Sequence, residues 1–365
     1  MDFTPTEAQL DLARLTGEIC AKLVTADRLR ELDTAGRFDE QLWKALAETG
    51  VLAAALPEAL GGSDFGALEQ TAILRELGKS VAAVPYLWSI AVGADALARF
   101  GDEAQRALAA RAGTGEIVLT AALAEPLHAT TDLPSIVAGE DGGWTVTGTA
   151  TTVAFADRAE RILVPATVSG QPAVFVVDPA HTSVTRTAQQ VVDLAPEFLV
   201  EFAATPAELL GTVETGAEVL ARLREQAWLG LSAAQLGTLE RALELTAEHT
   251  RTREQFGKPL GSFQAVAQRL SDAYIDIGGL RLTVTQAAWR VAEGLPATEA
   301  IHIAKFWAAD AGHKVAHTVV HIHGGLGIDR DHIAHNYFTA AKHNEFALGA
   351  ATPHLLALGA ELASA

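Results

Sequence analysis

Hydrophobic and polar positions follow three different patterns along the 365 residues of this chain. From residue 6 to about 112, apolar residues such as Leu12, Leu15 and Ile19 recur every three or four positions, which is the period of an amphipathic helix. From residue 117 to about 205, short β-branched runs such as 173–177 alternate with glycine-containing turns, which is typical of strands. From residue 207 onwards the helical period returns.

This order predicts an α+β fold with three domains. We expect an N-terminal all-α domain over residues 1–116, a middle β-barrel-like domain over 117–206 and a C-terminal four-helix-bundle domain over 207–365. The size agrees, because single hydrophobic cores stop growing beyond roughly 250–300 residues.

Two helical patterns in the last domain meet at a turn with unusual chemistry, residues 251–264. Gly257 and Pro259 end the first helix, and a second helix starts near Gln264. Arg253, Phe256 and Gln264 are therefore expected to cluster at one junction. A guanidinium there could bind a phosphate through two hydrogen bonds, and a ring could cover a flat base. By spacing alone, a helical hairpin with solvated charges fits equally well.

Composition restricts the partners and the compartment. A formal net charge of −18 disfavours nonspecific nucleic-acid binding. The single Cys20 excludes an intramolecular disulfide and agrees with a reducing cytoplasm. No basic start followed by an apolar stretch opens the sequence, and no uninterrupted apolar run reaches 18 residues, so we expect a cytoplasmic protein that does not enter a membrane. His317, His321 and His323 lack the glutamate of a zincin motif, so no metal site is expected.

The junction resembles the signature of the acyl-CoA dehydrogenase family, in which an arginine, a following Gln-Phe-Gly and a later Phe-Gln hold the ADP part of FAD. Residues 321–327, His-Ile-His-Gly-Gly-Leu-Gly, are similar to the family's Gln-Ile-His-Gly-Gly-Tyr-Gly, whose glycines let the backbone approach the flavin of a neighbouring subunit. Residues 50–62 add further matches. The resemblance implies FAD as cofactor and these contacts to it: Arg253, Gln255, Phe256, Gln264, His321, Gly324 and Gly325.

The family's catalytic base does not match. Members remove the α proton of an acyl-CoA with a glutamate while the β hydrogen leaves as hydride to the flavin, and Leu348 stands where most members carry that glutamate. In a minority the base lies 26 residues before the signature arginine, which is Ala227 here, with Glu225 two residues away and Trp228 in place of a frequent arginine. Two residues turn a helix by about 200°, so Glu225 should face the other side. Glu345 would need a shifted register.

The expected β domain departs from the family too. The family's Thr-Glu-Pro-Gly-Ala-Gly-Ser-Asp corresponds to residues 124–132, which keep Glu125 and Pro126 but lose the glycines that allow close backbone approach. Residues 152–154, Thr-Val-Ala, replace the family's Trp-Ile-Thr against the flavin ring. The features that serve a neighbour's flavin are kept, whereas those that serve this chain's own flavin are eroded.

These matches and losses lead to a preferred function and its alternatives. The resemblance implies an oxidoreductase that performs FAD-dependent α,β-dehydrogenation of an acyl-CoA and passes electrons to a separate electron-acceptor flavoprotein. This chain would be the partner subunit that completes the flavin site of a catalytic paralogue in a heterotetramer, similar to actinobacterial steroid-degrading members with two unlike subunits. A self-sufficient homo-oligomer with Glu225 as relocated base is the alternative. A flavin-free scaffold would leave Arg253 and Gln264 unexplained.

Overall fold

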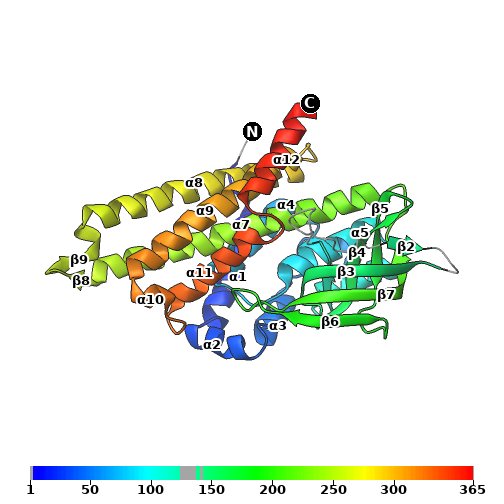
Figure 1. The fold of residues 1–365 in the computed structure, drawn as a ribbon, viewed down its shortest axis with the longest axis horizontal. Helices are drawn as coiled ribbons and strands as arrows, with labels where there is room; N and C mark the ends of the chain where they lie inside the picture. The colour runs from blue at the N-terminus through cyan, green and yellow to red at the C-terminus, as the bar shows by residue number, and fades with distance from the viewer. Residues whose placement is uncertain (1–2, 124–136, 140–142, 365) are drawn as a thin grey trace. The chain divides into compact units, whose positions relative to one another are not determined.

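The computed structural model describes residues 3–123, 137–139 and 143–364 (Figure 1). Two compact units combine early and late segments of the chain. The helical unit consists of Met1–Glu31, Ala67–Ala82 and Trp228–Ala365, and the sheet unit of Leu32–Gly66 and Ala83–Ala227. Two helices contribute residues to both units, α2 (Ala26–Thr34) and α7 (Gly216–Thr252).

Long helices and one short hairpin make up the helical unit. Its elements are α1 (Glu7–Leu23), α4 (Ala67–Lys79), β8 (Glu254–Gln255), β9 (Lys258–Pro259), η3 (Leu260–Ser262), α8 (Gln264–Ala292), α9 (Thr298–His323), α10 (Gly325–Ile328), α11 (Ile333–Phe346) and α12 (Ala351–Ser364). Helix α9 packs against α8, α10, α11 and α12, while α4 packs against α1 and α8 (Figure 1). The predicted junction between two helices is therefore confirmed as α7, a hairpin and α8.

The early helix α4 joins the late helices through glycines and a buried carboxylate. A Cβ on Gly78 would lie 2.1 Å from a carbonyl oxygen of α7, and one on Gly237 would lie 1.8 Å from the carbonyl oxygen of Arg75, so only glycine allows this approach. Buried Glu240 of α7 accepts hydrogen bonds at 2.7 and 2.8 Å from Arg75 and at 2.8 and 3.0 Å from Arg281 of α8. Charge-assisted bonds of this kind fix the three helices together.

The sheet unit combines short helices with a β-sheet. Its elements are α3 (Glu40–Glu48), η1 (Glu58–Leu60), the π-helix η2 (Tyr86–Ala94), α5 (Asp95–Phe100), α6 (Glu103–Gly113), β1 (Val118–Ala121), β2 (Val137–Gly139), β3 (Thr145–Ala154), β4 (Ala159–Val168), β5 (Gln171–Val177), β6 (Val184–Gln189) and β7 (Glu197–Leu209). The pairings run β1-β4-β2-β3-β7-β5, with β6 on β7. Because β5 also pairs with β4, five strands form a closed ring of pairings. Its core includes Val164, Phe175 and Val200.

A tight hairpin connects β4 to β5 where the sequence predicts a turn. Val168 pairs with Gln171, and the two residues between them, Ser169 and Gly170, have φ values of 49° and 84°. Two positive φ angles define a type I′ turn, which suits the right-handed twist of the flanking strands. The order of helical, sheet and helical parts confirms the predicted α+β fold.

One stretch of the helical unit, Ile333–Ala363, is long and apolar enough to cross a membrane by length and composition. Core helices pass the same test, and a single such stretch is weak support for a membrane span. Here the stretch is divided into α11 and α12, because Leu348 and Gly349 between them have φ values of 53° and 101°.

Candidate functional site

The hairpin between α7 and α8 carries an exposed aromatic ring on a strained turn. Gln255 pairs with Lys258, and the turn residues Phe256 and Gly257 have φ values of 54° and 77°. The left-handed conformation costs a non-glycine residue about 1–2 kcal/mol. The Phe256 ring is 91% exposed, so packing within the helical unit does not offset that cost. The exposed ring is therefore accessible to a ligand or a partner.

Arg253 leaves α7 at the base of this hairpin. Its backbone N–H donates to the His249 carbonyl oxygen and its own carbonyl accepts from Leu260 N–H, both at 2.9 Å, so the backbone is fixed on both sides. Its side chain is exposed, and no carboxylate among the described residues forms an ion pair with it. The backbone of Arg253 is thus fixed, and its exposed guanidinium retains donors for an anion.

The other side of the junction contributes a second aromatic ring and an amide. Phe263 lies 6.1 Å from Phe256 in an edge-on arrangement, and Lys258 Nζ sits 4.3 Å above the Phe263 ring. Gln264 begins α8 and is exposed. Arg253, Gln255, Phe256 and Gln264 are therefore brought to one exposed corner, as the sequence predicts.

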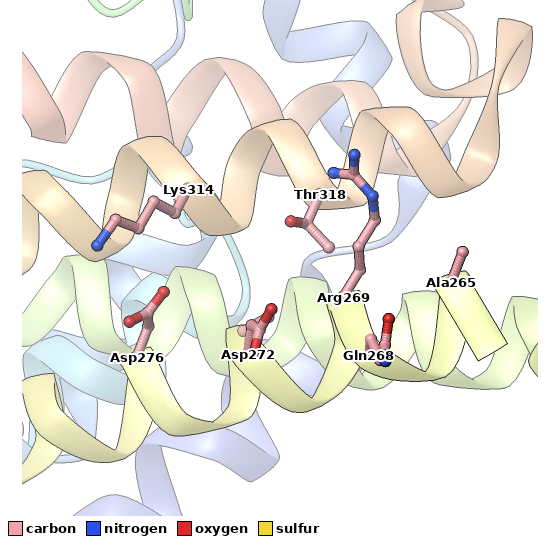
Figure 2. Close-up of a pocket in the computed structure, with 8 residues that line it drawn as sticks. Ala265, Gln268, Arg269, Asp272, Asp276, Lys314 and Thr318 are labelled. Carbon is pink, nitrogen blue, oxygen red and sulfur yellow. The ribbon is translucent and has the colours of Figure 1, made fainter.

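Two hollows flank α8. One of about 510 Å³ lies inside the corner, lined by Ala247, Thr250, Arg251, Pro259, Gly261, Ser262, Ala267 and Leu270. The other, of about 540 Å³, lies between α8 and α9 and is lined mainly by charged and polar side chains: Gln268, Arg269, Asp272, Asp276, Lys314 and Thr318 (Figure 2). In it, burial raises the pKa of Asp276, and Lys314 binds Asp310 at 2.7 Å.

The second predicted cofactor segment, residues 321–327, lies at the C-terminal end of α9; we call it the glycine segment. Gly324 has φ 62° and ψ −133°, a conformation that favours glycine. A Cβ on Gly325 would meet nothing within 4 Å, whereas one on Gly327 would lie 2.8 Å from Val320 Cα. Packing thus explains Gly327 but leaves open space at Gly325, where a ligand can approach the backbone. His321 is exposed one turn earlier.

Stacked imidazoles connect this glycine segment to the corner. The ring of His249, four residues before Arg253 on α7, stacks on His323 of α9 with centroids 4.4 Å apart and planes at 25°. His332 lies 5.3 Å from His323. Both predicted cofactor segments therefore lie at the same end of the helical unit (Figure 1). The sequence prediction missed His249, although its i−4 spacing from Arg253 places both on one helix face.

The turn at Leu348, where the sequence comparison places the family's base, is held by a polar cluster. The Leu348 carbonyl oxygen accepts hydrogen bonds from Trp228 Nε1 and His354 Nε2, both at 3.1 Å. His354 Nδ1 in turn lies 2.9 Å from His302 Nδ1. Two departures from the family pattern, Leu348 and Trp228, are thus in direct contact. The sequence prediction noted both but could not connect them, because they are 120 residues apart.

A buried lysine fixes the same turn from the other side. Lys305 is fully buried, and its Nζ donates to the carbonyl oxygens of Asn344, Glu345 and Gly349 at 3.1, 3.4 and 2.8 Å. Burial lowers its pKa to about 7, while the Glu345 charge acts in the opposite direction. The carbonyls at the end of α11 are therefore satisfied by a side chain.

The two alternative bases, Glu345 and Glu225, lie in different surroundings. Glu345 is buried and bound to His313 Nδ1 at 3.1 Å and to Lys342 Nζ at 2.5 Å, so its carboxylate is engaged in ion pairs. Glu225 is half-buried on α7, which runs without a break through Ala227. The continuous helix keeps Glu225 and Ala227 about 200° apart, as the sequence predicts.

Only part of the predicted flavin-ring region is described. Residues 124–132, including Glu125 and Pro126, lie outside the described residues. Thr152 to Ala154 lie in β3, where Thr152 has φ 51° and Val153 and Ala154 are buried. Among the described residues, no group of three or more His, Cys, Asp or Glu is arranged to hold a metal ion.

Two family models match the chain. The model of the acyl-CoA dehydrogenase N-terminal domain matches residues 6–111, and that of the C-terminal domain matches residues 215–362. The C-terminal match contains both the corner and the glycine segment.

Individual relatives match over the full length. Acyl-CoA dehydrogenase FadE27 of Mycobacterium tuberculosis is 47% identical over 100% of this chain and 99% of its own. A crystal structure of the ChsE4-ChsE5 complex from Mycobacterium tuberculosis has a chain with 47% identity and a TM-score of 0.95, with 100% of both chains covered. A variant of the Tcur3481-Tcur3483 "steroid ACAD" is 35% identical with a TM-score of 0.91, over 98% of this chain and 99% of the other.

Proposed function

Because the chain belongs to the acyl-CoA dehydrogenase family, we propose that it is the partner subunit of a heteromeric FAD-dependent acyl-CoA dehydrogenase. Its role is to complete the flavin site of a catalytic paralogue. The observation that carries this proposal is the contrast between the corner, where Arg253 and Phe256 are exposed, and the base position, where Leu348 is fixed in a turn. The kinship with a chain of the ChsE4-ChsE5 complex supports a heteromer.

The corner and the glycine segment suit the ADP part of FAD. Arg253 would bind the diphosphate through paired hydrogen bonds, and Phe256 would cover the adenine. Gly324 and Gly325 would let their backbone approach the diphosphate, which the open space beside Gly325 supports. Gln255, Gln264 and His321 would supply further polar contacts. Bound FAD would accept the hydride of the reaction.

The chain's own residues would bind and orient rather than move the α proton. Leu348 has no group that accepts a proton, and its turn is held by Trp228 and His354. Glu345 is engaged with Lys342 and His313. We therefore place the general base on the catalytic paralogue, which performs α,β-dehydrogenation of the acyl-CoA and passes electrons to an electron-acceptor flavoprotein.

A CoA thioester with a bulky steroid-derived acyl chain is the substrate class that we propose for the complex. A 35% identical relative over nearly the whole chain belongs to a steroid ACAD, which supports this choice. The alternative is a self-sufficient homo-oligomer in the cytoplasm with Glu225 as base. The half-buried position of Glu225 on α7 supports this alternative.

The visible absorbance spectrum separates these two proposals. We expect the protein purified alone to be colourless and to become part of a yellow, active complex when co-produced with a paralogous acyl-CoA dehydrogenase subunit. A yellow and active lone protein with one FAD per chain would favour the homo-oligomer instead. Absence of flavin from both preparations would overturn both proposals.

Replacement of Arg253 tests the corner within that complex. Arg253→Ala removes the exposed guanidinium, so we expect the FAD dissociation constant to rise at least about tenfold, equivalent to about 1.4 kcal/mol. The matched control is Arg241→Ala, which removes a partly exposed arginine from the same helix, about three turns before the corner. The fluorescence of FAD released after dilution measures the dissociation constant for both variant complexes. Equal FAD loss from the two variants would contradict a specific role for Arg253.

A further inference from the structure

Two exposed histidines of α9 and a buried carboxylate of α11 form a cluster that the proposed function does not use. We propose that His313 and His317 chelate one divalent transition-metal ion of the Zn²⁺ type, and that Glu345 supports them by orienting His313. The chelate has two protein ligands, with water completing the coordination, so it differs from the groups of three or more that are absent among the described residues. It does not depend on the flavin site.

The two histidines lie one helical turn apart on the same face of α9. Their spacing brings the rings together, with centroids 4.6 Å apart and planes at 52°. Both side chains are exposed. Two nitrogens bound to one tetrahedral Zn²⁺ at about 2.1 Å lie roughly 3.4 Å apart, which rings at this separation reach by small rotations. Imidazole nitrogen is a ligand that suits Zn²⁺, Ni²⁺ and Cu²⁺.

A carboxylate from the neighbouring helix orients the first ring. His313 Nδ1 lies 3.1 Å from Glu345 Oε1, so the ring donates its Nδ1–H to the carboxylate and Nε2 keeps the lone pair. Metal-binding histidines characteristically donate their second nitrogen to a carboxylate in this way. This contact distinguishes the pair from two histidines that are merely close on a helix surface. Spacing along the sequence could not predict it, because Glu345 reaches His313 only when α11 packs against α9.

Lys342 supports this arrangement of hydrogens. Its Nζ lies 2.5 Å from Glu345 Oε2 and 3.2 Å from His313 Nδ1. An ammonium could donate to Nδ1 only if that nitrogen carried a lone pair, whereas the carboxylate beside it needs a donor. Because the ammonium already donates to Glu345, the Nδ1–H form satisfies all three groups. The charges of Lys342 and Glu345 cancel, so the cluster does not repel a cation.

The second ring, His317, has its nitrogens available. It contacts the Phe338 ring of α11 edge-on at 5.8 Å, and no hydrogen bond uses its nitrogens within the part of the chain that the structure describes. Burial, followed by His313 and Lys342, lowers the pKa of His317, while Glu345 acts in the opposite direction. The lone pair is therefore present near neutral pH, as metal binding requires.

Occupation of the site would add a link between α9 and the end of α11. The Glu345 carbonyl oxygen already accepts a hydrogen bond from Lys305 of α9 at 3.4 Å, and the two helices lie side by side (Figure 1). A metal bound to His313 would connect α9 to α11 a second time through the Glu345 side chain. Since a ligand of the folded state stabilises it, Zn²⁺ should raise the midpoint of thermal unfolding. An unchanged midpoint at saturating Zn²⁺ would contradict this link.

Histidine NMR with the metal alone tests the chelate. The untagged, 13C-histidine-labelled chain is titrated with zinc chloride at pH 7, by itself and in the assembled complex. We expect one saturable site per chain, with shifts of the His313 and His317 signals and an unchanged His181 on an exposed turn of the sheet unit. Absence of saturable binding, or shifts confined to other histidines, would overturn the proposal. A site lost on assembly would refute it for the working protein, because the partner would then cover this face.

Single substitutions identify the ligands. His313→Asn and His317→Asn each remove one of the two ligands from an exposed position, so saturable Zn²⁺ binding by the lone chain should disappear in both. The matched control is His321→Asn, which is exposed and one further turn along α9, and it should bind Zn²⁺ like the wild type. Binding that survives in His313→Asn and is lost in His321→Asn would assign the metal to the wrong pair and overturn the chelate.

Glu345→Gln tests the supporting carboxylate. Glutamine keeps the size and an acceptor for His313 but has no charge, so we expect the Zn²⁺ dissociation constant to rise about tenfold, at the lower end of the 10–100-fold typical of such partners. Circular dichroism checks the fold of this variant. Lys342→Met provides a second test, because removal of the competing cation should leave Zn²⁺ binding at least as tight as in the wild type. Unchanged affinity in Glu345→Gln, or weaker binding in Lys342→Met, would refute the role of the carboxylate.

Discussion

Phe256 combines a strained backbone with a ring that packs against almost nothing. Its φ of 54° places it in the left-handed region, and its side chain is 91% exposed. Type I′ hairpins prefer Asn-Gly at their two central positions, and this chain has Phe-Gly. A residue that weakens its own turn and remains exposed is best understood through what binds to it.

Phe256→Asn should therefore stabilise the lone chain and weaken cofactor binding in the complex. Asparagine tolerates the left-handed conformation, so we expect a gain of about 0.5–1 kcal/mol in unfolding free energy. Loss of the ring should raise the FAD dissociation constant in the complex several-fold. Urea unfolding and flavin release measure the two effects. A less stable Phe256→Asn would show that the ring supports the turn.

The sequence predicted which residues meet at the corner, but it did not predict the histidines that pack beside them. Arg253, Phe256 and Gln264 could be grouped because two helices and a tight turn force them together. His249 has the same helical face as Arg253, but only the packing of α9 against α7 reveals its stack on His323. Local spacing thus predicts contacts within one turn, whereas contacts between distant helices require the folded structure.

Among the elements, the turn between α11 and α12 is held by hydrogen bonds from three side chains. Its two central carbonyls, those of Leu348 and Gly349, accept hydrogen bonds from Trp228, His354 and Lys305. All three donors are provided by other elements or by the following helix. This network orients α12 without using a carboxylate at the turn.

The pH dependence of stability should report this turn through His354. Burial, followed by the Lys305 charge, lowers the pKa of His354 to about 3, against about 6.5 in an unfolded chain. The neutral ring is therefore favoured by folding. Its contribution is complete above pH 6.5 and is lost as pH falls from 6.5 towards 3, because only the unfolded chain takes up the proton. The slope is at most about 1.4 kcal/mol per pH unit.

A non-titrating side chain isolates that contribution. His354→Gln provides one acceptor for His302 and one donor for Leu348, so we expect a shallower fall in unfolding free energy between pH 6.5 and 4 than in the wild type. His181→Gln, on an exposed turn of the sheet unit, is the control. Urea titrations at each pH give the free energies. Parallel curves for wild type and His354→Gln would contradict this account.

At the scale of the whole molecule, hydrophobic periodicity predicted the order of helical, sheet and helical parts but not their grouping. Helices α1 and α4 belong to the same unit as α8 to α12. The close contact at Gly78 and Gly237 and the ion pairs of Glu240 bring this about. The contacts between α4 and α7 have no local sequence signal, since they join segments about 160 residues apart. The bounds of the three domains, 1–116, 117–206 and 207–365, remain a proposal from the sequence.

The complex as a whole decides whether this chain provides a base. Glu225→Gln keeps the size and hydrogen-bonding capacity of the side chain but cannot accept the α proton. If this chain is the partner subunit, turnover of the assembled complex with a steroid-derived acyl-CoA should change less than about twofold. If Glu225 is the base, removal of general-base catalysis should lower kcat by at least about 10²-fold. Glu218→Gln, an exposed position on the same helix, is the matched control. Steady-state kinetics of complexes with equal FAD content separate the two outcomes, because only the loss of a base lowers kcat without loss of flavin.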